Sequence, residues 1–408
     1  MDSGDRVSCS YAGSMLEGTY ITKRDGKAVI KLGNGYNIGV SFDAVTKTGD
    51  AEKREVVKGG FTQEEGLPDL AIVSTGGTIA SKIDYRTGAV TSQFEAEDIM
   101  RAIPGLASIG NFTSHVPATI LSENMTASIW RELASTIYSE IESGVEGVIV
   151  THGTDTMSYS AAAVSFMLKT PVPVVFVGSQ RSADRPSSDN LMNGLCSAAA
   201  AVSDLGEVSV VMHGTSSDDY CAIHRGTRVR KMHTSRRDAF RTLDMDILGK
   251  VDYPSLKVSL NKHAGRRGSF EPELHADLEE KVGLVQFYPG MNPDLIRSYD
   301  GYAGLVVAGS GLGHTSSACI EPLRELVSSG TTVVMTSQCL NGRVCDRVYD
   351  TGRDLIEAGV IEGVDMLPEV AMVKLMWVLG MEDDKEKVRE LMLSDLRGEL
   401  GGCTPHGL

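Results

Sequence analysis

Threonine hydroxyls gather in two short, glycine-containing segments of this sequence. The first, AIVSTGGTIAS at residues 71–81, places Thr75 and Thr78 on either side of a glycine pair. The second, THGTDT at residues 151–156, adds an acidic side chain. A threonine in such a segment can present its hydroxyl to a small molecule, and the alternative is a plain β-to-α loop with incidental threonines. A threonine hydroxyl acts as a nucleophile only when it is paired with a base. Glycine lets the backbone turn tightly and approach a small molecule closely.

An apolar run directly precedes each cluster, which predicts a buried strand ending in a polar loop. From residue 69 onward, apolar runs alternate with helix-like stretches, as expected of a doubly wound α/β sheet. Sites in such sheets lie outside the carboxyl ends of the strands. The predicted strands are 70–74, 147–150, 174–178, 208–213, 282–287, 304–308 and 332–336, and the predicted helices are 93–101, 127–143, 157–168, 191–203 and 369–379.

The first 50 residues predict a separate small β-barrel. Short strand-like runs at 6–10, 17–22, 27–32 and 36–42 are divided by turn residues such as Asp25-Gly26. A frayed extension is the alternative for this part of the chain. Charges and glycines dominate the residues that follow, so 51–68 is interpreted as a linker.

The remainder is expected to form two α/β domains, 69–255 and 281–408, joined by a connector at 256–280. The charged residues from 381 onward are expected to be peripheral. Residues 213–242 are expected to form a loop whose basic side chains are mostly solvated: Arg225, Arg228, Arg230, Lys231, Arg236, Arg237 and Arg241.

The composition and motifs of the chain disfavour several classes of function. The chain has 408 residues, 41% of them apolar, and a formal net charge of −15, which disfavours indiscriminate nucleic-acid binding. No apolar run approaches the ~20 residues of a membrane helix, and no secretory signal is visible. Seven scattered cysteines without CxxC spacing favour reduced thiols in the cytoplasm and disfavour a zinc site. The glycine-rich segment 309–313 fails the GxGxxG spacing, and no phosphate-binding loop occurs, so this chain shows no ATP site.

TGGTIAS and THGTDT together resemble the paired threonine motifs of the L-asparaginase family. The resemblance runs from about residue 69 to about residue 380. It implies an α/β fold in which the small N-terminal β-barrel is followed by a two-domain asparaginase-like core. It also implies amidohydrolase activity on glutamine or asparagine.

Site residues follow from this resemblance motif by motif. Thr78 matches the first nucleophilic threonine, and Tyr85 matches the tyrosine that partners it on a mobile loop. Thr154 and Asp155 match the second threonine and its acidic neighbour, and Lys231 matches the lysine that would serve as base. Taken alone, Asp155 could instead cap the following helix, and Lys231 could be an ordinary surface lysine.

The same resemblance assigns the substrate contacts. Ser122 and Glu123 match the pair that holds the α-groups of the amino acid, with glutamate where many relatives carry glutamine. Gly77 lies in the first motif, and Ser179 occupies the position whose backbone helps to hold the developing oxyanion. The preference between asparagine and glutamine stays open. His152 is expected to be structural.

The amino-terminal unit also resembles the barrel that precedes the asparaginase-like core in the D subunits of archaeal glutamyl-tRNA(Gln) amidotransferases. This resemblance implies a homodimeric core whose ammonia passes to a partner, the E subunit of the amidotransferase, for amidation on tRNA(Gln). ATP and magnesium are then expected on that partner, and this chain needs no cofactor or metal of its own. Two alternatives stay open: a free cytosolic L-asparaginase, and a non-catalytic scaffold or RNA-binding module with the same fold. Ammonia release from glutamine, with and without partner and charged tRNA, would discriminate among them.

Overall fold

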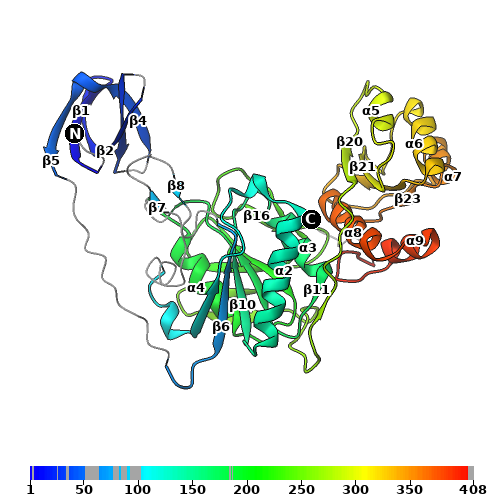
Figure 1. Cartoon of the computed structure of the whole chain (residues 1–408), viewed down its shortest axis with the longest axis horizontal. Helices are drawn as coiled ribbons and strands as arrows, with labels where there is room; N and C mark the ends of the chain where they lie inside the picture. Colours follow the sequence, from blue (N-terminus) through cyan, green and yellow to red (C-terminus); the bar gives the residue numbers. More distant parts are fainter. Residues whose placement is uncertain are drawn as a thin grey trace.

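Three structural units follow one another along the chain (Figure 1). The computed structural model describes residues 1, 4–24, 26–33, 36–50, 64–76, 82–83, 90–91, 103–182, 185 and 187–402. The expected helix at 93–101 and most of the expected linker lie outside the described residues. Among the described residues, no helix combines the length and apolarity needed to cross a membrane.

The amino-terminal unit is one antiparallel sheet of five strands in the order β4-β3-β2-β1-β5. Alternate residues face inward and form a small core that includes Val7, Cys9 and Ile30. This confirms the predicted β-rich unit, with β5 as a strand beyond the four predicted ranges. The strands are β1 (Arg6–Tyr11), β2 (Ser14–Arg24), β3 (Lys27–Leu32), β4 (Asn37–Ser41) and β5 (Val45–Gly49).

The central unit is built on an eight-stranded sheet in the order β18-β17-β14-β13-β12-β10-β6-β9. Its parallel part confirms the predicted α/β class. Three further strands, β14, β17 and β18, continue it in antiparallel pairing. The strands are β6 (Asp69–Ser74), β9 (Asn111–His115), β10 (Gly147–Thr151), β12 (Val174–Val177), β13 (Val208–His213), β14 (Tyr220–Arg225), β17 (Gly249–Asp252) and β18 (Lys257–Leu260).

Helices cover both faces of this sheet. One face packs against α2 (Ala127–Glu142) and α3 (Met157–Met167), and the other packs against α4 (Asn190–Ala201). α2 buries one stripe of apolar residues at helical spacing, and its N-cap Thr126 accepts a hydrogen bond from the backbone of Ile129. α3 is buried on nearly all sides because it lies between the sheet and a second helical layer.

Two expectations for this unit are wrong. The stretch 213–242 is not a solvated loop: besides β14 it contains the hairpin β15 (Val229–Lys231) and β16 (Phe240–Thr242). Arg228 in this stretch is only 1% exposed. A guanidinium can be buried in this way where oxygen acceptors replace water. The expected connector also begins too early, since β18 lies beyond residue 255 and pairs with β17 at the sheet edge.

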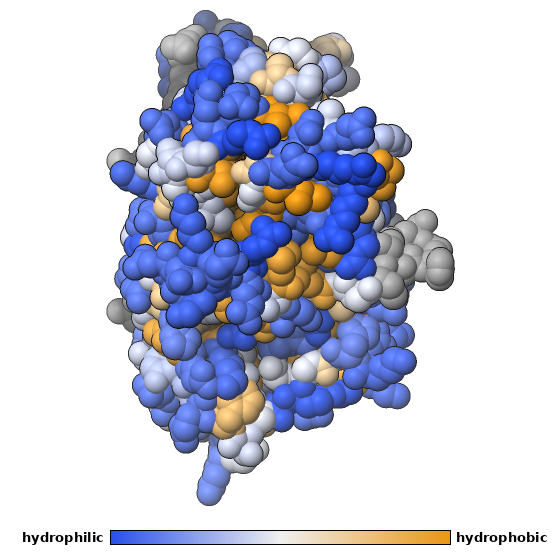
Figure 2. Space-filling model, turned by 90° about the vertical axis from the view of Figure 1, so that its right-hand side faces the viewer, coloured by the Kyte–Doolittle hydropathy of each residue, from blue (hydrophilic) through white to orange (hydrophobic). Residues whose placement is uncertain are grey.

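The carboxy-terminal unit is a parallel four-stranded sheet in the order β20-β21-β22-β23. α5, α6 and α7 pack on one face, while α8 packs on the other face and also against α3 of the central unit. The rings of Phe166 and Trp377 stack across this contact, 6.0 Å apart. The elements are β20 (Val282–Gln286), α5 (Asp294–Arg297), β21 (Gly304–Gly309), α6 (Ser317–Ser329), β22 (Thr332–Ser337), α7 (Asp350–Glu357), β23 (Ile361–Glu362) and α8 (Pro368–Met381). Figure 2 shows the molecule from the side on which the carboxy-terminal unit lies in Figure 1. This surface is mostly hydrophilic, with apolar side chains gathered toward its middle (Figure 2).

The residues after α8 are not peripheral, contrary to the expectation. α9 (Lys385–Leu393) is followed by a segment, residues 394–402, that returns to the central unit. Within it, Glu399 has no exposed side-chain surface and pairs with the equally buried Lys374 of α8 at 2.6 Å. Charged side chains of this segment can therefore lie in the interior, because each buried charge has an opposite charge or a carbonyl beside it.

Candidate active site

The two threonine-rich segments meet at the carboxyl edge of the central sheet. β6 and β10 are neighbouring parallel strands, with Ser74 opposite Thr151. The backbone N–H of Thr75 donates to the carbonyl of Thr151 at 3.0 Å, and the Thr151 hydroxyl donates to Ser74 Oγ at 2.9 Å. These bonds tie the start of TGGT to the start of THGTDT, as the sequence analysis expected from parallel strands.

Lys231 connects the second motif to a distant part of the chain. Its Nζ lies 2.9 Å from Thr154 Oγ1 and 2.7 Å from Asp155 Oδ1. The lysine side chain is 13% exposed, whereas the Asp155 side chain is 69% exposed. A threonine hydroxyl, an amine and a carboxylate in mutual hydrogen-bond reach form an arrangement in which the amine can exchange a proton with the hydroxyl.

The alternative of a helix cap for Asp155 is not what the structure shows. Thr156 is the N-cap residue of α3, and its hydroxyl donates to the carbonyl of Ser122 at 2.8 Å. His152 is fully buried, and burial lowers its pKa to about 4, so it is neutral near pH 7. It lies next to the Gly153 carbonyl, with Nδ1 at 2.7 Å. These contacts favour the expected structural role of His152.

Glycine at two positions lets the predicted substrate loops approach the second motif. A Cβ at Gly153 would lie 2.7 Å from the Cβ of Ser122, and one at Gly178 would lie 2.8 Å from Thr154 Cγ2. Both distances are too short for a real side chain. Ser122 is buried, and Glu123 is exposed on the same short helical turn, η4 (Ser122–Asn124).

Ser179 is oriented by a residue that the sequence analysis missed. Its hydroxyl donates to Asp189 Oδ1 at 2.8 Å and also reaches the Arg181 carbonyl. Asp189 further accepts from the backbone N–H groups of Gln180 and Arg181, both at 2.9 Å. The Ser179 side chain is therefore turned into its own loop. The signal for Asp189 was its place directly before α4, where acidic residues commonly organise loop backbone.

Three predicted residues, Gly77, Thr78 and Tyr85, lie outside the described residues. Next to them, the backbone of β7 (Lys82–Ile83) pairs antiparallel with that of β8 (Val90–Thr91). The structure thus brings together Thr154, Asp155 and Lys231 and places Ser122 and the Gly178–Ser179 backbone against the same motif. Glu123 is exposed next to Ser122, and the roles of all nine residues remain predictions.

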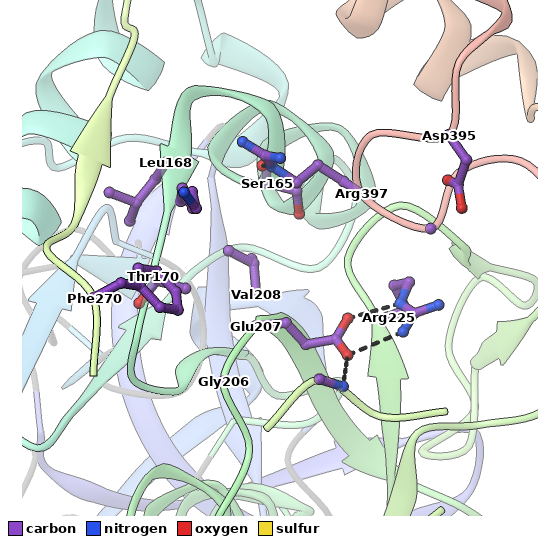
Figure 3. A pocket seen from close by; sticks show the side chains of 13 residues that line it. Ser165, Leu168, Thr170, Gly206, Glu207, Val208, Arg225, Phe270, Asp395 and Arg397 are labelled. Carbon is purple, nitrogen blue, oxygen red and sulfur yellow. Dashed lines mark hydrogen bonds and ion pairs between the residues drawn. The ribbon is translucent and has the colours of Figure 1, made fainter. Parts of the chain in front are cut away.

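A cavity of about 340 Å³ lies elsewhere, where the residues after α9 meet the central unit (Figure 3). None of the candidate site residues lines it. Its charged lining is largely engaged already: Arg225 pairs with Glu207 through two hydrogen bonds of 2.7 and 3.0 Å, and Glu207 also accepts from the Gly265 backbone. This cavity is therefore separate from the residues predicted to form the site.

Known families match all three units. The family model described as "Asparaginase, N-terminal" matches residues 69–264, and "Glutaminase/Asparaginase C-terminal domain" matches residues 281–392. "GatD N-terminal domain" matches residues 1–48. Among solved structures, the chain resembles the thermostable L-asparaginase from Thermococcus kodakarensis, at 30% identity and a TM-score of 0.73, covering 82% of this chain and 99% of that one. An L-asparaginase I from Vibrio cholerae gives 27% identity and a TM-score of 0.71, with the same coverage. Fold and site together are those of asparaginase-type amidohydrolases.

Curated relatives make this class more specific. A protein from Methanosarcina acetivorans, named as the D subunit of glutamyl-tRNA(Gln) amidotransferase, is 54% identical over 98% of both chains. Proteins of the same name from Archaeoglobus fulgidus and Halobacterium salinarum are each 53% identical, over 99% and 94% of this chain and 96% and 95% of those proteins. The chain belongs to the family of glutamyl-tRNA(Gln) amidotransferase D subunits, and the predicted family, fold and activity class are thereby confirmed.

Proposed function

We propose that this chain releases ammonia from glutamine or asparagine and that the ammonia is used to amidate glutamyl-tRNA(Gln). The observation that carries the proposal is the 2.9 Å contact between Lys231 Nζ and Thr154 Oγ1, with Asp155 on the same nitrogen. A surface lysine has no need of such partners, while a base for a hydroxyl does.

The chemistry has two halves. In the first, the Thr78 hydroxyl attacks the side-chain amide carbon and its proton passes to the amide nitrogen, so that the C–N bond breaks and the nitrogen leaves as ammonia. In the second, water attacks the resulting ester, gives one proton to the Thr78 oxygen and frees the acid product. Lys231 would serve as the base for the Thr154 hydroxyl, and Asp155 would fix the geometry of the amine. Tyr85 partners Thr78 in the first half.

The surrounding loops would hold the substrate. Glu123 is exposed at the edge of the site, where a carboxylate suits the α-ammonium group of the amino acid, and Ser122 would serve its α-carboxylate. Backbone groups at Gly77 and Ser179 would stabilise the negative charge that develops on the amide oxygen. The Asp189 contacts support this role, because they fix the backbone on both sides of Gln180.

The remaining steps would take place on a partner. We propose that the E subunit of the amidotransferase activates the glutamate on tRNA(Gln) with ATP and magnesium and receives the ammonia, while this chain binds no cofactor or metal. The amino-terminal unit supports this division, since it matches the GatD N-terminal domain and not an asparaginase model. Free thiols at the six described cysteines agree with action in the cytoplasm, where charged tRNA is found.

We also propose a homodimeric core. Leu121, next to Ser122, is 62% exposed, and Leu312, Val348 and Tyr349 of the carboxy-terminal unit are 36%, 54% and 59% exposed. Exposed apolar side chains next to a candidate site are commonly covered by a second copy. Sedimentation of the purified chain would distinguish a dimer from a monomer.

The test of the function is ammonia release from glutamine and from asparagine by the full chain, alone and with its partner and glutamyl-tRNA(Gln). Partner- and tRNA-dependent release is the expected result. A chain lacking residues 1–50 should keep a folded core and lose that stimulation. Full tRNA amidation by the truncated chain would give the barrel another role, and absence of ammonia release under every condition would contradict the proposal.

A further inference from the structure

We propose that Arg228 and Asp365 are positioning residues for Lys231: through them, the carboxy-terminal unit fixes the strand that presents the lysine to Thr154. The inference rests on the proposed function, because its effect is measured on ammonia release. Neither residue lies within hydrogen-bond reach of the Thr154–Asp155–Lys231 group in the described contacts, so both would act through Lys231.

Arg228 directly precedes β15 and is almost completely buried. Its Nη1 donates to the Asp365 carbonyl at 3.1 Å, and its Nη2 donates to Asp365 Oδ2 at 3.2 Å. Its Nε donates to the Gly398 carbonyl at 3.0 Å. The Asp365 side chain has no exposed surface and accepts the backbone N–H of Gly401 at 3.1 Å. Among the described residues, every hydrogen-bond partner of this guanidinium comes from the carboxy-terminal unit or the residues after α9.

Side chains of β15, the strand that follows Arg228, point in turn toward the central unit and toward the carboxy-terminal unit. Arg230, two residues beyond Arg228, points toward the same unit, with its Nε 3.5 Å from Glu369 Oε1. Val229 lies in the core of the central unit, and Lys231 reaches Thr154. Successive side chains of an extended strand point to opposite faces, so one register satisfies both sets of contacts. A slip of one residue would send Lys231 toward Asp365 and Glu369 and leave Thr154 without its amine.

The two acidic partners lie close together in the sequence. Asp365 is in the turn between β23 and α8, and Glu369 lies in the first turn of α8 and is 3% exposed. α8 itself packs on α3, the helix that begins directly after Thr156. One helix layer thus holds the strand that carries Lys231 and backs the helix that follows Thr154, which fixes the distance between the two groups.

Thr227, directly before Arg228, is also held by the residues after α9, here through an uncharged hydroxyl. The Thr227 hydroxyl, 1% exposed, donates to the Arg397 carbonyl at 2.9 Å. The Leu243 N–H donates to the Arg228 carbonyl at 3.0 Å, so the same turn is also held by the end of the β15–β16 hairpin. Removal of a buried guanidinium leaves the Asp365 carboxylate without its charge partner, which relaxes the turn and moves the lysine. A displacement of about 1 Å at a reacting group can cost about 100-fold in rate.

The experiment measures glutamine hydrolysis by the full chain under the conditions in which the wild type releases ammonia. Arg228→Gln is expected to lower kcat by about 100-fold and to leave KM within about twofold, because the substrate contacts proposed at Ser122 and Glu123 are untouched. Arg228→Lys, which keeps a charge but loses the forked geometry, should recover only part of kcat. Thr227→Val, which loses one hydrogen bond, should lower kcat by about three- to tenfold.

Matched variants separate positioning from general loosening. Arg267 also donates to two backbone carbonyls, those of Ser203 and Ala201, and Thr331 also donates one bond from a buried hydroxyl, to Tyr302. Arg267→Gln and Thr331→Val should lower the melting temperature and keep wild-type kcat; the loss for Arg267→Gln should be smaller than that for Arg228→Gln, because Arg228 also pairs with the buried Asp365 carboxylate. Equal kcat losses in the matched variants, or wild-type kcat in folded Arg228→Gln and Thr227→Val, would overturn the inference. A wild-type chain that releases no ammonia at all would overturn the proposed function and this inference with it.

Discussion

The central and carboxy-terminal sheets each carry a glycine-containing loop after a parallel strand, and the loops differ in how their polar groups are satisfied. After β10, the Thr154 hydroxyl and Asp155 meet Lys231 from a separate hairpin. In the second loop, which follows β22, Asp346 Oδ1 lies 4.0 Å from Nδ1 of His314, which follows β21. Within the part of the chain that the structure describes, their ring nitrogens and carboxylate oxygens have no hydrogen-bond partner. The first loop therefore meets an amine that bonds both of its polar groups, whereas the second loop brings together a carboxylate and an imidazole that share no hydrogen bond.

The lack of a hydrogen-bond partner in the second loop, among the described residues, is reflected in the pKa of Asp346. Burial raises the pKa of Asp346 to about 7, and the neighbouring Glu362 carboxylate acts in the same direction. The Glu362 side chain accepts the Asp346 backbone N–H at 3.1 Å and pairs with Arg347 at 3.2 Å. An unpaired buried carboxylate is disfavoured, and the neutral form predominates below that pKa.

The largest expected difference between the two loops comes from removing the Thr154 hydroxyl in the loop after β10. Thr154→Val keeps the shape of the side chain and leaves Lys231 with Asp155 alone. We expect ammonia release from glutamine to fall about 10⁴-fold, as for groups that act as a unit. Thr154→Ser, which restores a hydroxyl, should recover a measurable part of the rate. Turnover near the wild-type rate in folded Thr154→Val would exclude this loop from catalysis.

The next effect comes from the base. Lys231→Arg keeps a positive charge but cannot give up its proton near neutral pH. Both Lys231→Arg and Lys231→Ala should therefore lose about 10²- to 10⁴-fold in kcat. Lys250→Arg, at the exposed edge of β17, is the matched control and should be fully active. Substantial activity in Lys231→Arg would leave Lys231 as an electrostatic anchor and not a base.

A change at Asp346, in the second loop, should alter the free energy of unfolding and its dependence on pH. The folded state holds a proton on Asp346 that the unfolded state releases, so this group's contribution is present at low pH and is lost as pH rises from about 4 to about 7. Asp346→Asn stays neutral, so we expect it to exceed the wild type by about 2–4 kcal/mol at pH 8 and by little at pH 4.

Urea unfolding at the two pH values measures this difference, with the exposed Asp300→Asn as control. Because burial lowers the pKa of His152 and of His224, wild-type stability also falls as pH drops below about 6.5, so the comparison is made between variants at each pH. Identical curves for wild type and Asp346→Asn at pH 8 would show that the folded protein tolerates the ionised carboxylate.

The smallest expected effect lies at the edge of the site. Glu123→Gln keeps the size of the side chain and removes its charge, so the proposed α-ammonium contact weakens. We expect KM for glutamine to rise about tenfold while kcat changes little. Glu132→Gln, on the exposed face of α2, is the control. An unchanged KM would move the α-ammonium contact to another residue.

Sequence patterns predicted four buried strands of the central sheet, β6, β10, β12 and β13, and its helices α2, α3 and α4, because a buried strand such as β10 has an apolar signature that needs no partner to be recognised. The motif residues Thr154 and Asp155 were found for the same reason, since they follow that strand directly. The patterns missed the other four strands, β9, β14, β17 and β18, of which β9 and β18 are only partly buried. Arg228 and Asp189 could not be found in this way. Their roles depend on acceptors and donors far along the chain or in a folded loop, and an arginine in a basic run has the same local sequence whether it is solvated or buried.

The hydrogen bonds from Thr227 and Arg228 to the segment after α9 each span 170 residues. A ribosome adds about 5–20 residues per second, so these partners are synthesised about 10–30 seconds after the strand that they hold. Asp365, the other partner of the Arg228 guanidinium, is synthesised 137 residues after it, so for most of that interval the guanidinium lacks both partners while the nascent central unit can complete its sheet. The last step of folding is then the arrival of the newest residues of the chain at one of its older strands.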